Sequence, residues 1–132
     1  MPPAALGAAA AIHFKYLKGE IKDPQAELLS ICGNDPSAAA FARGFKAGGY
    51  REGWRQVAAE ISKEFGKSHW FATYVADAYL RAEDHALAID WLEKAYEFRD
   101  HTLVYLSCGL SYAPVRSDPR IQALQRKMNL PL

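Results

Sequence analysis

The chain has few of the residues that build metal and redox sites. Its 132 residues include two cysteines, Cys32 and Cys108, each in an apolar setting and with no second cysteine nearby. This arrangement excludes a zinc knuckle and a Cys-x-x-Cys redox pair. We expect two buried thiols in a reduced compartment, and a single disulfide between them is also compatible with the sequence.

The chain also lacks an excess of charge and a long apolar run. Its formal net charge is +1, and the basic residues are spread along the sequence, which favours neither nucleic acid nor an anionic membrane as a partner. No stretch approaches the roughly 18 apolar residues of a membrane span. The Ala-rich segment 1–14 has no positively charged region typical of a signal peptide. We therefore expect a cytoplasmic protein.

Motifs of the common enzyme classes are absent as well. The glycines between residues 44 and 53 follow no predicted strand and precede no Lys-Ser or Lys-Thr pair, so they do not form a phosphate-binding loop. The chain has neither a G-x-S-x-G elbow nor an H-E-x-x-H motif. The sequence therefore predicts a protein that is not an enzyme and that needs no cofactor and no metal.

What the chain does contain is helical periodicity. Half of its residues are hydrophobic and 23% are charged, which is typical of a globular domain, and the length suits one domain over residues 1–132. Apolar residues recur at i, i+3, i+4 and i+7 from Trp54 to Phe65 and from Phe71 to Ala82. This spacing indicates amphipathic helices, and strand signals are scarce, so the predicted fold class is all-α.

Helix boundaries are marked by Asp-Pro pairs at Asp23, Asp35 and Asp118. An aspartate caps the free N–H groups of a first turn, and proline fits there because its missing N–H is not needed. The predicted helices cover about 4–18, 24–32, 36–47, 50–65, 68–82, 84–98 and 118–128, with an irregular stretch at 99–117. Short linkers predict that neighbouring helices pack as antiparallel pairs.

Two Asp-His pairs, Asp84-His85 and Asp100-His101, stand at the two ends of one predicted helix. A helix of this length places them about 24 Å apart, so they cannot share a metal or catalytic site. We expect Asp84 to cap the helix and Asp100 to lie where the chain turns after it. Both histidines are expected to be exposed. Of the other two, we expect an exposed helix end for His69 and a half-buried core position for His13.

The predicted helix pairs at 36–65 and 68–98 share one pattern. In the second pair, small residues at Ala76, Ala88 and Ala95 would let the helix backbones approach closely. A self-similar helix pair of about 34 residues is the signature of a tetratricopeptide repeat, and the chain resembles that family.

The C-terminal half carries a further resemblance. The segment "AYLRAEDHALAIDWLEKAYEFRDHTLVYL" followed by "RSDPRIQALQRKMNLP" resembles the C-terminal repeat region of bacterial multidomain regulators. The chain departs from it at residues 107–115. The resemblance implies a short α-solenoid of three antiparallel helix hairpins, about 4–32, 36–65 and 68–98, closed by a capping helix at about 118–128.

The same resemblance implies where a partner would bind. In this repeat family the first helix of each pair lines a concave face that docks peptides. The residues that map to this face are Phe45, Lys46, Trp70, Thr73, Asp77, Leu80 and Arg81. An alternative for Phe45 and Trp70 is that they pack between hairpins. Thr73 and Asp77 stand where relatives that grip a terminal carboxylate use Lys and Asn, so that specialisation is not indicated.

The sequence therefore favours a protein-interaction module that binds a peptide or a partner helix, or that pairs with itself as a homodimer. The alternative is a regulatory module of a bacterial signalling or transcription system that senses a small ligand in a pocket between hairpins. An enzyme is a third hypothesis, and it would need a histidine, a cysteine and a carboxylate to converge in space.

Overall fold

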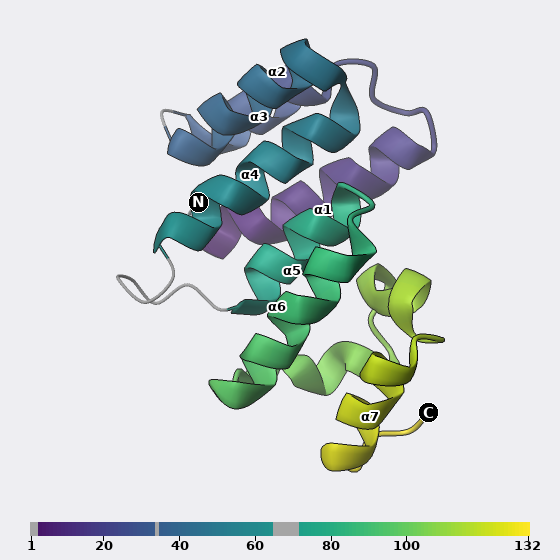
Figure 1. Cartoon of the computed structure of the whole chain (residues 1–132). Coiled ribbons are helices and arrows are strands. Elements are labelled where there is room, and N and C mark those ends of the chain that lie inside the picture. The colour runs from purple at the N-terminus through teal and green to yellow at the C-terminus, as the bar shows by residue number, and fades with distance from the viewer. Residues whose placement is uncertain (1–2, 34, 65–71) are drawn as a thin grey trace.

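The computed structural model describes residues 3–33, 35–64 and 72–132, and helices stack in it from α2 at one end to α7 at the other (Figure 1). The described part contains no strand, so the predicted all-α class is confirmed for it. The helices are α1 (Pro3–Leu17), α2 (Pro24–Cys32), α3 (Pro36–Gly48), α4 (Tyr50–Glu64), α5 (Ala72–Arg81), α6 (His85–Glu97), the 3-10 helices η1 (His101–Ser107) and η2 (Leu110–Val115), and α7 (Pro119–Lys127).

The predicted caps are confirmed where the three Asp-Pro pairs begin a helix. The side chain of Asp23 accepts a hydrogen bond from the backbone N–H of Ala26, and Asp35 and Asp118 cap α3 and α7 in the same way. Asp84 caps α6 by accepting from the N–H of Leu87. Local sequence therefore defines these helix starts, because each cap satisfies an N–H group that the first turn leaves open.

Glycines let α3 and α4 pack closely along each other. A side chain at Gly44 would run into the backbone carbonyl of Glu52, and one at Gly53 would come within 2.7 Å of the Phe41 ring. The ring of Phe41 also meets that of Trp54 edge-on at a centroid distance of 5.4 Å. These two glycines are therefore contact positions inside helices, where the cost in helix propensity is offset by close packing.

Two apolar cores hold the described helices together. The first gathers buried side chains of α1 to α5, including Leu28, Phe41 and Trp54, and the second gathers those of α5, α6, η1, η2 and α7. The half-buried rings of Tyr79 and Trp91 contact both cores. Helix α5 contributes buried residues to each core, so it links the two halves of the molecule.

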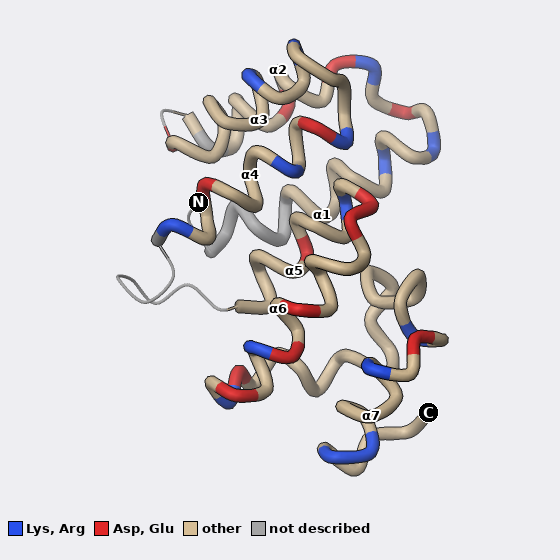
Figure 2. Tube along the Cα trace, viewed as in Figure 1, with Lys and Arg blue, Asp and Glu red and all other residues tan. Residues whose placement is uncertain are grey.

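The stretch at 99–117 was expected to be irregular, but it forms η1 and η2. Both are short 3-10 helices, which carry weak periodicity and are hard to recognise from sequence. After them, α7 buries Ile121 and Leu124 in the second core. Arg120 of α7 donates hydrogen bonds to Asp90, at 2.6 Å, and to Glu93 of α6. Basic residues gather at the C-terminal end of α7 (Figure 2), where the helix dipole favours them.

Helix α1 contacts α2 and also packs on later helices. Its buried residues Ala9 and Ile12 belong to the first core, together with residues of α4 and α5 such as Val75. In Figure 1, α1 runs beside α4 and α5, and α2, which contacts α1, also lies next to α3. The N-terminal helix therefore covers a face of the later helices.

We expect Ala88→Leu to lower the free energy of unfolding by about 1–3 kcal/mol, because Ala88 is 0% exposed and extra methylenes there overpack the contact between α5 and α6. The matched control is Ala86→Leu in the same helix, at an exposed position, which should change stability by about 0.5 kcal/mol or less. Urea titration of both variants measures the difference. Equal values for the two variants would contradict this packing.

Candidate functional site

The residues expected on an exposed face of α5 are mostly buried. Thr73, Leu80 and Arg81 are 1%, 7% and 8% exposed. Asp77, on the same face, is half-buried. The expectation that these side chains are open to a partner is therefore wrong for Thr73, Leu80 and Arg81 in the free chain, because η2, Asp100 and residues of α1 and α4 lie over them.

The other three predicted residues lie in different surroundings. Phe45 is half-buried, packs against the first core and meets Phe41 at a ring-centroid distance of 5.8 Å, as expected for a residue between hairpins. Lys46 is exposed at the end of α3. Trp70 lies outside the described residues. The structure thus leaves Lys46 as the one predicted side chain that is shown to be open to solvent.

Asp100 ties α5 to the start of η1. Its Oδ2 accepts a hydrogen bond from the hydroxyl of Thr73 at 2.9 Å, and its Oδ1 accepts from the backbone N–H and the hydroxyl of Thr102 at 2.9 and 2.7 Å. Asp100 is 7% exposed, so these bonds compensate for the water that the carboxylate loses. Asp100 therefore caps η1 and fixes it against α5.

A second group of polar side chains is buried where η2 meets α5. One carboxylate oxygen of Asp77 is buried and makes no hydrogen bond to the described residues. Desolvation raises the pKa of Asp77 to about 6, while the charge of Arg81 and a hydrogen bond with Tyr112 act in the opposite direction. Burial also raises the pKa of Tyr112. Asp77 is thus a carboxylate held in an environment that disfavours its charge.

Arg81 extends this group towards α4 and α1. Its guanidinium lies over the indole of Trp54, 4.7 Å from the ring centroid, in a cation–π contact. Burial lowers the pKa of Arg81, and the negative charge of Asp77 opposes that effect. Burial raises the pKa of the nearby Tyr50 to about 12. Burying the guanidinium of Arg81 costs solvation free energy, and the charge of Asp77 offsets part of that cost.

His13 of α1 completes this arrangement. Its Nδ1 is 2.7 Å from the hydroxyl of Tyr50. Desolvation, with a contribution from the charge of Arg81, lowers the pKa of His13 to about 4, so the imidazole is neutral in the folded protein at neutral pH. The expected half-buried position of His13 is confirmed.

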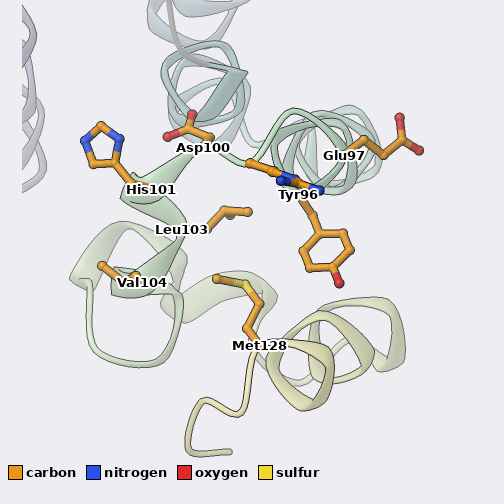
Figure 3. Close-up of a pocket in the computed structure, with 8 residues that line it drawn as sticks. Tyr96, Glu97, Asp100, His101, Leu103, Val104 and Met128 are labelled. Carbon is orange, nitrogen blue, oxygen red and sulfur yellow. The ribbon is translucent and has the colours of Figure 1, made fainter.

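An open pocket of about 470 Å³ lies between the end of α6, η1 and the end of α7. Its apolar lining comes from Tyr96, Leu103, Val104 and Met128 (Figure 3). Met128 points towards Leu103, and the ring of Tyr96 reaches down beside it. The polar lining residues are Glu97, Arg99, Asp100 and His101.

Apolar side chains are exposed on the segments that line this pocket. Val104 and Tyr105 on η1 are 51% and 59% exposed, and Phe98 at the end of α6 is 65% exposed. Of these three residues, Val104 lines the pocket itself, and exposed apolar side chains beside a pocket are typical of docking surfaces. Sequence reasoning did not find this pocket, because its lining comes from three segments that only tertiary packing brings together.

The remaining histidines and cysteines lie in separate places where the structure describes them. His85 and His101 are exposed, as expected, and His69 lies outside the described residues. Cys108 is an exposed free thiol, so its expected burial is wrong, and the side chain of Cys32 lies outside the described residues. Within the described ranges, no three His, Cys, Asp or Glu side chains come close enough to hold a metal ion.

No helix among the described residues combines the length and the apolar character needed to cross a membrane.

Comparisons of the chain with protein-family models, curated proteins and solved structures found no match. The resemblance to tetratricopeptide repeats therefore remains a prediction from the sequence.

Titration of Asp77 should leave a signature in the pH dependence of stability. Its folded-state pKa of about 6 lies above the ordinary value of 3.8, so protonation stabilises the folded state as pH falls from about 8 towards 4. Between pH 8 and pH 5, we expect the free energy of unfolding of wild type to rise by about 1 kcal/mol relative to that of Asp77→Asn.

His13 contributes with the opposite sign, since its lowered pKa makes its stabilisation disappear as pH falls from 6.5 to about 4. The comparison with Asp77→Asn isolates the carboxyl group, because His13 is present in both proteins. The measurement is urea unfolding at the two pH values, with the exposed Glu97→Gln as the control. A difference that does not change with pH would contradict the burial of the charged Asp77.

Proposed function

We propose that the chain is a non-catalytic protein-interaction module with a short tetratricopeptide-like solenoid, and that it binds a peptide through an apolar anchor residue. The proposal places the anchor in the pocket between α6, η1 and α7. The observation that supports it most is an open pocket of about 470 Å³ whose lining includes the apolar side chains of Leu103, Met128 and the half-exposed Val104.

The chemistry of the pocket favours a peptide over a strongly charged ligand. The lining carries charges of both signs, with carboxylates at Glu97 and Asp100 and a guanidinium at Arg99. An apolar side chain that enters beside Leu103 would bury its surface, and the polar rim would pair with the peptide backbone. Because many bound peptides rely on one buried aromatic or aliphatic anchor, a single pocket of this size supports this mode.

The alternative is a regulatory module that senses a small ligand. The pocket volume lies within the range of about 300–1,000 Å³ that is typical of small-molecule sites, which supports this alternative too. A small ligand and a peptide anchor would use the same residues, so the two functions differ in what binds and not in where it binds.

A phage-displayed library of random peptides, panned against the full chain, tests the proposal. We expect the selected peptides to share a Leu, Phe or Trp, and a labelled selected peptide should bind Val104→Asp at least about tenfold more weakly than wild type, since the new charge must lose its water in the pocket. The matched control is Leu110→Asp on η2, which is 74% exposed and does not line the pocket.

Equal loss of binding in both variants, or no loss in either, would contradict the assignment of the pocket. If the library yields no peptide while a small-molecule screen raises the melting temperature of wild type and not of Val104→Asp, the ligand-sensing alternative is favoured instead.

A further inference from the structure

The turn between η1 and η2 presents an apolar surface without charged groups. Residues 102–115 contain no Asp, Glu, Lys or Arg, although 23% of the chain is charged. The exposed residues within this stretch are Val104, Tyr105, Cys108, Leu110, Ala113 and Pro114. Leu110 is 74% exposed, more than any other large apolar side chain of the described residues. Depletion of charge is characteristic of the centre of a protein interface.

Hydrogen bonds hold this turn in one shape. The backbone N–H of Gly109 donates to the carbonyl oxygen of Tyr105 at 2.6 Å, and the guanidinium of Arg116 donates to the carbonyl oxygen of Gly109. Val104 and Leu110 directly adjoin the bonded pair of Tyr105 and Gly109, so they lie near each other. Because Val104 also lines the pocket between α6, η1 and α7, an exposed apolar side chain lies close to the wall of that pocket.

We propose that the apolar anchor that enters this pocket is Leu110 of a second copy of the chain, and that the two copies exchange this contact about a two-fold axis. The inference rests on the proposed function, because it uses the same pocket and names its partner. In a two-fold dimer, a contact made by one copy is made in reverse by the other. Leu110 of each copy therefore buries its side chain beside Val104, Leu103 and Met128 of the other.

The distribution of charge supports a second copy as the partner. If Leu110 of one copy meets Val104 of the other, the two-fold axis passes close to the middle of the turn between these residues, where Tyr105 and Cys108 lie. A residue at such an axis meets its own copy, so a charged side chain there would face a like charge. Residues 102–115 carry no charged side chain, and this surface can therefore pair with itself without that repulsion.

Sedimentation equilibrium of the full chain tests the pairing. The exposed residues of the turn and the pocket together are fewer than the roughly 20–30 residues that each side of a standard interface contributes, so we expect a weak dimer that forms as concentration rises. Leu110→Asp and Val104→Asp should each weaken dimerisation at least about tenfold, since a charge in the contact loses its water. The matched control is Leu29→Asp on α2, a position 42% exposed, which should dimerise like wild type. Circular dichroism checks that each variant is folded.

A mixture of two variants tests the reciprocal exchange. Leu110→Asp keeps the pocket and loses the anchor, whereas Val104→Lys keeps the anchor and alters the pocket. The mixed dimer retains one anchor with one intact pocket, and the introduced carboxylate faces the introduced amine. We expect the mixture to dimerise at least about tenfold more tightly than either variant alone. Equal association of the mixture and of the separate variants would contradict the exchange.

Cross-linking of Cys108 tests where the axis lies. Its thiol is free and exposed, and the proposed axis passes beside it. A short bis-maleimide should join Cys108 of wild type to its own copy at concentrations where the dimer is present. Leu110→Asp and Cys108→Ser should each remove this cross-linked dimer. A wild-type dimer that is not joined through Cys108 would overturn the proposed arrangement.

Failure of this inference is distinguishable from failure of the proposed function. Wild type that stays monomeric at millimolar concentration, or a dimer that Leu110→Asp leaves unchanged, overturns the inference alone. The pocket remains a peptide site in that case if a selected peptide loses affinity for Val104→Asp and keeps it for Leu110→Asp. If the chain binds neither peptides nor a second copy, both proposals are wrong.

Discussion

Close packing around α5 is the constraint on which the rest of the structure depends. Small side chains on this helix enter both cores: Val75 and Ala78 the first, and Ala72 and Ala76 the second. Because an alanine lets a neighbouring backbone approach, α4, α6 and η2 can all pack on α5. That crowding also explains why its polar residues are buried: α1, α4 and η2 all pack near Asp77 and Arg81.

The buried charges on α5 have a cost that their surroundings only partly offset. Asp77 keeps an oxygen without a hydrogen bond to the described residues, and Arg81 is compensated mainly by an indole ring and by the potential of Asp77. Asp100, in contrast, has both of its oxygens hydrogen-bonded. A fully satisfied carboxylate serves the fold, whereas an incompletely satisfied pair of charges indicates a place where stability is given up.

The helix map was predictable from sequence because its signals are local. Asp-Pro pairs, Asp84 and the spacing of apolar residues define the starts and faces of helices within a few residues of themselves. The burial of Ala88 and the exposure of His85 follow from the same periodicity. The two 3-10 helices were missed, since their few residues carry no comparable period, and the burial of Cys108 was wrongly expected from its apolar neighbours in the sequence.

By itself the sequence determined that the chain is helical, where most helices begin, and which alanines lie at helix contacts, because each depends on residues three or four positions apart. Only the tertiary structure decided which surfaces stay open. It brought Met128 to Leu103 and Val104 to form a pocket, and it placed α1 over Tyr50, far along the chain. Whether a helix face is exposed depends on which distant segments pack on it. The local spacing of residues does not predict such long-range contacts.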